Sequence, residues 1–432
     1  MVRTRVVFFT ALMLVLAARV WAQDLPATLT LQDALQLARA QNPTLAAASS
    51  DVAVAEADLN QATRRLNPAL TFGSEGYPAF EPSPHPPFWD GQELTIRFDQ
   101  EIEIGGRRGR RSDAAVAATT VARSRLNDQR RRIDLAVQRS YLQVVLAKAD
   151  REVARDALAD IDRVLGISKA RLDQGEISGG EFRRLQVERL RFVDDQFATE
   201  LALKNAKAAL LSILGVADLN RPFEVTGVLT EVPASLAAAG AGASSSVFDR
   251  AALERQALAA RPDVLAARSE EQRADSETQL QRALRTPNIT VGGGYKRTLT
   301  SDGIVFGVTM PLALFNRNPG GIARAEAAQR RAASQTAAAE AVVRLEVQQA
   351  VNAIEANQAR VRYIEQDTLT AAREARDAIG AAYQVGEAGL IDYLDAQRSF
   401  RETLRLYNRA LYERRISDFE VAAAIGGPSI QP

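Results

Sequence analysis

The sequence predicts a mainly α-helical fold with a small β part, written as two copies of one structural unit. Three observations support this: long stretches free of glycine and proline, short segments that alternate between apolar and polar residues, and glycine and proline residues that recur at a fixed spacing. Glycine and proline are the least favourable residues in a helix interior, so stretches without them are candidate helices. Segments with a period of two are candidate strands.

The repeat is visible in the positions of the glycine and proline residues. Pro68 and Pro287 are 219 positions apart, whereas Gly175 and Gly386 are 211 apart. The difference of eight falls in the proline-rich segment 77–89, where a loop absorbs it. We therefore expect a signal peptide at 1–22, a first repeat at 23–215, a linker rich in Ala, Gly and Ser at 216–248, and a second repeat at 249–432.

The helix candidates occur in matching pairs, one member in each half. Six helices are predicted, over about 44–67, 107–172, 181–214, 263–286, 320–383 and 390–425. The glycine- and proline-free parts of the two longest would run about 85 Å at 1.5 Å per residue. Small and branched residues recur in them every seven positions, as at Ile133, Ser140 and Ala147. This spacing is typical of a coiled-coil seam, so each long helix needs a partner.

Four strands are predicted, over about 68–77, 93–104, 287–296 and 303–312. In the second of them Ile96 and Phe98 alternate with Thr95 and Arg97. Such alternation suits a barrel strand between lipid and water, and equally a small soluble hairpin packed on its apolar face. Four strands cannot close into a barrel, which needs about eight, and lipid does not tolerate an open edge. The strands are therefore either outside a membrane or part of a barrel shared by several chains.

The N-terminus has the features of a secretory signal. Arg3 and Arg5 precede the apolar run 6–16, and Val20-Trp21-Ala22 ends in a small residue, which predicts cleavage after Ala22. A membrane anchor is the alternative, but this run is too short to span a bilayer. No cysteine is present to accept a lipid.

Composition excludes several classes of function. The 54 Lys and Arg balance 53 Asp and Glu, which argues against a nucleic-acid partner. The chain has one histidine, His85, in a proline-rich loop, and no cysteine. Transition-metal sites need imidazole and thiolate clusters, and a Ser-His-Asp triad needs a positioned histidine. We therefore expect no enzyme, no cofactor and no metal site within the chain.

Two segments carry a resemblance to a known family. The sequence YQVGEAGLIDYLDAQ at 383–397 resembles the periplasmic tip of the second helical hairpin in TolC-like outer-membrane efflux proteins. The opening LTLQDAL at 29–35, followed by Asn42-Pro43, is similar to the N-terminal signature of this family. The resemblance covers nearly the whole mature chain. Within the family, 103–108 and 310–318 resemble the heavy-metal (cobalt-zinc-cadmium type) cation efflux branch.

The resemblance implies a passive duct in the outer membrane of a Gram-negative bacterium, with a helical portion in the periplasm. Three identical chains would share a twelve-stranded transmembrane β-barrel in outer-membrane lipid and continue it as an α-barrel. A periplasmic adaptor (membrane fusion) protein and an inner-membrane RND-type transporter would be the partners. Drug efflux or type I protein secretion through the same architecture remains open, and so does a soluble periplasmic coiled-coil scaffold.

The candidate site is a pair of acidic residues. Asp392 and Asp395 are three positions apart and so share one helix face, next to Gly386 and Gly389. On the residues alone they are ordinary carboxylates at the start of a helix. The resemblance aligns them with the carboxylates around the narrow pore entrance, where a trimer would bring six together. At the spacing of 211, the first half has Glu181 and Arg184 instead.

The resemblance also assigns residues of the periplasmic tip and adaptor contact, namely Gly175, Gly179, Tyr383, Gly386 and Gly389. Ala388 stands where some members have an arginine that latches the closed tip. The basic cluster 107–111 lies just past a strand, and the sequence leaves open whether it meets lipid headgroups or water.

Overall fold

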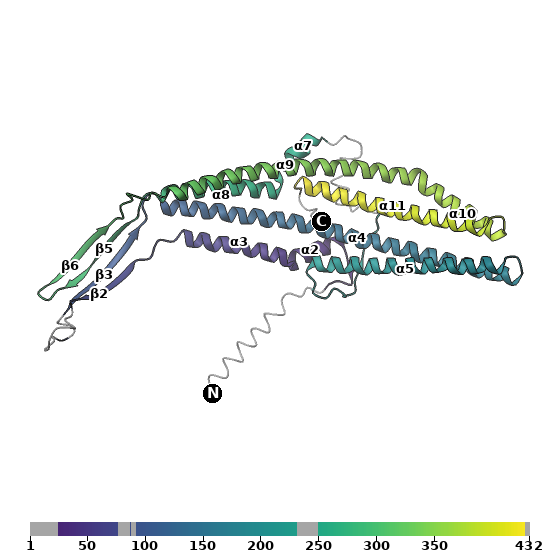
Figure 1. Cartoon of the computed structure of the whole chain (residues 1–432), viewed down its shortest axis with the longest axis horizontal. Helices are drawn as coiled ribbons and strands as arrows, with labels where there is room; N and C mark the ends of the chain where they lie inside the picture. Colours follow the sequence, from purple (N-terminus) through teal and green to yellow (C-terminus); the bar gives the residue numbers. More distant parts are fainter. Residues whose placement is uncertain (1–24, 77–86, 88–91, 231–248, 428–432) are drawn as a thin grey trace, which may run out of the picture. The chain divides into compact units, whose positions relative to one another are not determined.

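The computed structural model describes residues 25–76, 87, 92–230 and 249–427. The predicted signal peptide, His85 and the 231–248 part of the predicted linker lie outside the described residues. The described residues form long helices, one four-stranded sheet and one two-stranded sheet, so the fold class predicted from the sequence is confirmed (Figure 1).

The chain divides into two compact units, and neither unit is one of the sequence repeats. Among the described residues, unit 1 consists of 25–47, 127–230, 249–261 and 341–427, and unit 2 of 48–76, 87, 92–126 and 262–340. Each unit therefore takes segments from both repeats. Three helices have residues in both units: α3 (Pro43–Ala62), α4 (Arg107–Asp173) and α9 (Pro319–Tyr363).

Unit 2 contains an antiparallel sheet in the order β2-β3-β5-β6, so the two repeats meet at the β3–β5 pair. Helix α8 (Pro262–Ala283) precedes β5. The strands are β2 (Ala69–Glu75), β3 (Glu93–Ile102), β5 (Ile289–Arg297) and β6 (Asp302–Thr309).

One face of this sheet is apolar and exposed. Phe98 of β3 and Phe306 of β6 both pair with Gly293 of β5, which places them on the same face. Phe98 is 54% exposed and Phe306 is 84% exposed. The other large apolar side chains exposed on this face are Leu70, Phe72, Ile96, Ile102, Val291, Tyr295, Ile304 and Val308.

The opposite face is polar. On this face, β5 and β6 have glycines next to the charged side chains of β3. Arg97 forms an ion pair with Asp99 at 2.7 Å. A Cβ atom at Gly292 would collide with the Asp99 carboxylate, and one at Gly307 would lie 2.9 Å from an Arg97 guanidinium nitrogen. The glycines of β5 and β6 therefore leave the space that this ion pair occupies.

Unit 1 is helical and contains two apolar clusters, the larger of which includes Leu29 and Val225 of the two-stranded sheet. The short strand β1 pairs in parallel with β4, and the Tyr141 hydroxyl of α4 donates to Leu29 O at 3.1 Å. Phe223 and Leu229, on either side of β4, are buried in the core. The elements are β1 (Thr28–Leu29), α2 (Leu31–Gln41), α5 (Gly179–Leu214), β4 (Glu224–Val225), α7 (Arg250–Ala260), η1 (Ile364–Thr368), α10 (Leu369–Val385) and α11 (Leu390–Ala424).

The seven-residue seams of unit 1 are buried or half-buried, as their spacing predicts, with Ile133 and Ser140 half-buried. In α4 the buried seam residues include Val137, Val144, Ala147, Ala154 and Ile161; in α9 they include Val343, Val347, Ile354 and Val361. The second long helix differs from the prediction of one continuous helix over about 320–383. The π-helical segment η1 separates α9 from α10, with Leu369 N–H donating to Ile364 O. A π-turn inserts a residue into the helix, and this shifts the residues of the following turns to a different side of the helix.

The internal repeat extends to the contacts at the C-terminal ends of α5 and α11, the last helix of each half. Gly215, after α5, and Gly426, after α11, both have left-handed backbones, with φ of 81° and 66°. In the first half Asn42 donates from Nδ2 to Ile213 O at 2.8 Å. In the second half the buried Arg261 donates to Ala424 O at 3.3 Å. Asparagine and arginine thus fill equivalent places and donate to equivalent carbonyls.

Candidate functional site

The site predicted from the sequence lies at the ends of two helical hairpins of unit 1, α4–α5 and α10–α11 (Figure 1). Gly175 has a φ of 79°, and its N–H and that of Glu176 donate back to the last turn of α4, the second of them to Arg171 O at 2.9 Å. The same two bonds recur 211 positions later at Gly386 and Glu387. This is a Schellman motif, which needs a left-handed residue and therefore favours glycine.

The following helices begin differently in the two hairpins. In α5 the Ser178 side chain accepts from the Glu181 N–H at 3.1 Å. Gly179 is the first residue of α5, and a Cβ atom there would meet nothing within 4 Å. In α11 the cap residue is Gly389, whose N–H donates to the Asp392 carboxylate at 3.3 Å. The first turn thus stabilises the second hairpin through Asp392.

Asp392 and Asp395 are both exposed on the same side of α11. Asp395 forms an ion pair with Arg398 at 3.3 Å, one turn further along. Neither carboxylate is buried, and each has one local partner. Their oxygen lone pairs are therefore only partly used, and both side chains can still interact with cations in water.

Tyr383 has a different environment from the glycines of the tip. It is 2% exposed and stacks on Tyr393, with ring centroids 5.1 Å apart. Its hydroxyl lies 3.2 Å from Ser168 Oγ, so it joins α10 to α4. Burial raises the pKa of Tyr393 to about 12. The rings form the centre of a small apolar cluster with Ile161, Val164, Leu185, Phe192, Leu390 and Leu394.

The sequence reasoning missed Arg171, which ties the two hairpin ends together. Its guanidinium donates to Tyr383 O at 3.2 Å, lies over the Tyr383 ring and pairs with Glu176 at 3.2 Å. A basic residue in the last turn of α4 is visible in the sequence, but that position is also favourable through the helix dipole alone. Its partner is 212 positions away, and no local pattern indicates it.

The described residues contain no group of three or more His, Cys, Asp or Glu side chains placed to hold a metal ion. None of the helices in the described part of the chain combines the length and the apolar character needed to cross a membrane.

Comparisons with known proteins find relatives over two thirds of the chain or more. The chain is 26% identical to the cobalt-zinc-cadmium resistance protein CzcC of Cupriavidus metallidurans over 383 residues, 88% of this chain and 86% of that protein. It is 28% identical to the nickel and cobalt resistance protein CnrC of the same organism over 295 residues, 67% of this chain and 64% of that protein.

The fold is similar to the crystal structure of CusC, with a TM-score of 0.75 at 18% identity over 92% of both chains. The model of the outer membrane efflux protein family matches residues 34–216 and 253–427. These matches include both hairpin tips and all four strands of the larger sheet. The chain belongs to the outer membrane efflux protein family.

Proposed function

We propose that this chain is the outer-membrane channel of a tripartite efflux system and acts as a passive trimeric duct for heavy-metal cations from the periplasm to the exterior. The exposed apolar face of the four-stranded sheet carries this proposal. Phe306 is 84% exposed and Ile304 is 76% exposed on a face where large apolar side chains predominate. Exposed apolar patches of this kind mark a surface that meets lipid or another protein.

The sheet also has two open edges, because β2 and β6 each pair on one side only among the described strands. Lipid does not tolerate unpaired backbone groups. If β6 of one copy pairs with β2 of the next, three copies complete a twelve-stranded closed sheet. The apolar face would then meet lipid, and the Arg97–Asp99 face would line the water-filled lumen.

We propose that Asp392 and Asp395 line the periplasmic entrance of the duct, six carboxylates in a trimer, and favour cations. Their exposure supports this role. The exposed turns at Gly175, Gly179, Gly386 and Gly389 offer backbone to the periplasmic adaptor protein. The buried Tyr383 cannot present its ring to a partner, so its contribution is to hold the two turns in place.

The substrate assignment rests on the relatives named for resistance to cobalt, zinc, cadmium and nickel. A duct that only passes ions needs no dedicated ligand cluster, because selection belongs to the inner-membrane RND-type transporter. A negatively charged entrance is compatible with metal cations and imposes little chemical choice among them.

Removal of the gene from its host tests the proposal. Growth should become sensitive to cobalt, zinc or cadmium, and a plasmid copy should restore resistance. The protein should sediment with outer membranes and form a trimer in detergent, as measured by its mass. Sensitivity to drugs without sensitivity to metals would indicate a multidrug duct, and loss of a secreted protein would indicate type I secretion. A protein released without detergent would be a periplasmic scaffold.

A further inference from the structure

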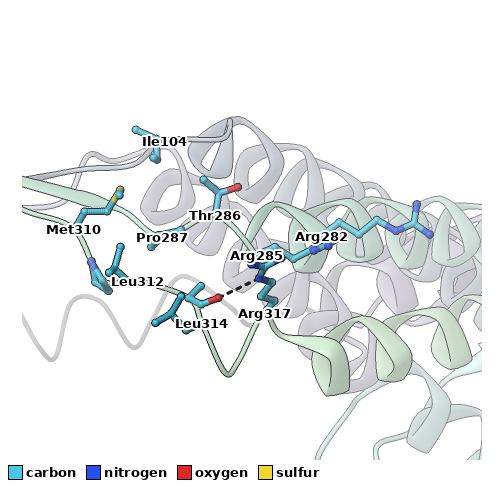
Figure 2. A pocket seen from close by; sticks show the side chains of 11 residues that line it. Ile104, Arg282, Arg285, Thr286, Pro287, Met310, Leu312, Leu314 and Arg317 are labelled. Atoms are coloured by element: carbon cyan, nitrogen blue, oxygen red, sulfur yellow. Dashed lines mark hydrogen bonds between the residues drawn. The ribbon is translucent and has the colours of Figure 1, made fainter.

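A pocket of about 620 Å³ lies in unit 2, just beyond the ends of β3 and β6 (Figure 2). Met310 directly follows β6, and Ile104 comes two residues after the end of β3. The lining combines two kinds of side chain: apolar ones from the segment after β6, and arginines from the end of α8 and the approach to α9. The residues that matter here are Met310, Leu312, Leu314, Arg282, Arg285 and Arg317.

The apolar wall continues the exposed face of the sheet. Val308 of β6 is exposed on that face, and Met310, Leu312 and Leu314 are 46%, 69% and 68% exposed in turn. Every second residue from Val308 of β6 to Leu314 in the pocket lining is therefore apolar and exposed. The pocket therefore lies next to the end of the exposed apolar face of the sheet.

Two of the three arginines keep an uncompensated charge. Arg282 pairs with Glu326 at 3.0 Å. Arg317 donates from Nε to Ala313 O at 3.1 Å, which orients the guanidinium but does not neutralise it (Figure 2). Within the described ranges, Arg285 and Arg317 form no ion pair, and both are exposed. Two positive charges thus stand beside an apolar wall.

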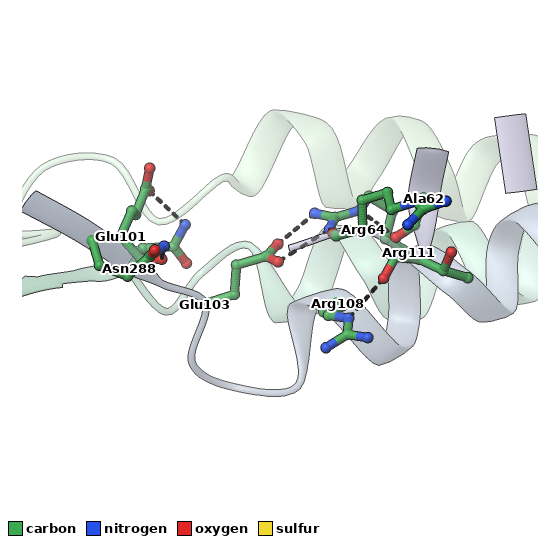
Figure 3. A network of polar contacts seen from close by, with 9 residues as sticks. Ala62, Arg64, Glu101, Glu103, Arg108, Arg111 and Asn288 are labelled. Carbon is green, nitrogen blue, oxygen red and sulfur yellow. Dashed lines mark hydrogen bonds and ion pairs between the residues drawn. The ribbon is translucent and has the colours of Figure 1, made fainter. Parts of the chain in front are cut away.

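Two arginines of the basic cluster 107–111, at the same end of unit 2, bind other groups of the protein. Arg108 donates to Thr63 O at 2.9 Å, and Arg111 pairs with Glu103 and donates to Ala62 O at 3.0 Å (Figure 3). These bonds satisfy carbonyl groups at the C-terminus of α3. Structural capping therefore accounts for Arg108 and Arg111 but not for Arg285 and Arg317.

We propose that this pocket binds an anionic phospholipid, with its phosphate on Arg285 and Arg317 and an acyl chain along Met310, Leu312 and Leu314. The inference rests on the proposed function, which places the apolar face of the sheet in lipid. Guanidinium groups bind phosphate through paired hydrogen bonds, and each buried methylene adds apolar stabilisation. A free anion would leave the apolar wall uncovered. An apolar surface of a second copy would bury two unpaired charges, which is unfavourable.

Purified full-length protein in nonionic detergent tests this by native mass spectrometry with phosphatidylglycerol and phosphatidylethanolamine of identical acyl chains. Wild type should bind phosphatidylglycerol more tightly. Arg285→Gln with Arg317→Gln should weaken that binding about 30-fold and remove the preference. Arg65→Gln with Arg324→Gln is the matched control, because both residues are exposed arginines near the same end of unit 2 but outside the pocket lining. It should stay within about twofold of wild type.

Further variants and a competition experiment identify what binds in the pocket. Leu312→Asn with Leu314→Asn should also weaken lipid binding, and sn-glycerol 3-phosphate should not displace the lipid. Displacement by glycerol phosphate would make this a free-anion site and overturn the proposal. Loss of the assembled mass with an unchanged lipid preference would make it an interface between copies, which also overturns it. A wild type that sediments with outer membranes but binds both lipids equally defeats this inference alone, whereas one that does not sediment defeats the proposed function.

Discussion

Asp392 combines a structural bond with an exposed charge, so the choice of substitution matters. An asparagine at this position keeps an oxygen that can accept from the Gly389 N–H, whereas alanine removes the cap. Asp392→Asn with Asp395→Asn therefore removes up to six charges per trimer with little change at the helix start. The double variant should assemble normally and lose cation selectivity and block by divalent ions in planar bilayers.

Glu402→Gln is the matched control for this experiment, because Glu402 is exposed on α11 but lies about two turns beyond the pair. It should leave selectivity unchanged. If the double aspartate variant behaves like wild type, the two carboxylates serve only the helix and do not line the entrance.

Alanine substitutions at three glycines distinguish the effect of backbone conformation on stability from that of close packing. Gly166 lies inside α4 with open space around it, so Gly166→Ala should stabilise the protein by about 0.5–1 kcal/mol. Gly175→Ala meets only the penalty of its left-handed backbone, about 1–2 kcal/mol. Gly426→Ala should be worse, because its Cβ would also lie 2.8 Å from Arg261 N.

Thermal unfolding of the three variants, followed by circular dichroism at one protein concentration, gives the order of stability directly. The expected order is Gly166→Ala above wild type, then Gly175→Ala, then Gly426→Ala. Equal midpoints for the last two would mean that the approach of α11 to Arg261 is not tight in solution.

Among the elements, the four-stranded sheet has the clearest difference in polarity between its two faces. Phe306 is on the apolar face and Thr95 on the polar face. Phe306→Arg should impair insertion by about 2–4 kcal/mol if the residue lies near mid-bilayer, because a charge there must leave water. Thr95→Arg should be tolerated. The yield of trimer in the outer-membrane fraction measures both, and equal yields would reject the proposal that the apolar face meets lipid.

The helices of unit 1 depend on long-range pairs as well as on their seams. Asp195 of α5 pairs with Arg405 of α11 at 2.7 Å, and Arg401 of α11 lies over the ring of Phe192. The π-helical segment η1 is held by a bond from the Tyr407 hydroxyl to Glu365 at 2.7 Å. Each contact joins segments that the sequence separates, so helix periodicity predicts the helices but not these ties.

On the scale of the whole molecule, the repeat explains why neither compact unit is a sequence half. Each half contributes two strands to the sheet of unit 2 and one hairpin tip to unit 1. A single half would leave β3 or β5 without its central partner. The central β3–β5 pairing of the sheet therefore requires both copies of the repeat.

The sequence by itself determined the fold class, the repeat, the six main helical segments apart from the π-helical break, and the four strands of the larger sheet. These depend on local periodicity and on backbone preferences that act over a few residues. Only the tertiary structure showed that Tyr383 is buried, that Arg171 joins the two tips, and that Arg285 and Arg317 meet an apolar wall. These features arise when packing brings segments together, in the case of Arg171 and Tyr383 from opposite halves of the chain, and no local pattern records which of several exposed arginines will remain without a carboxylate.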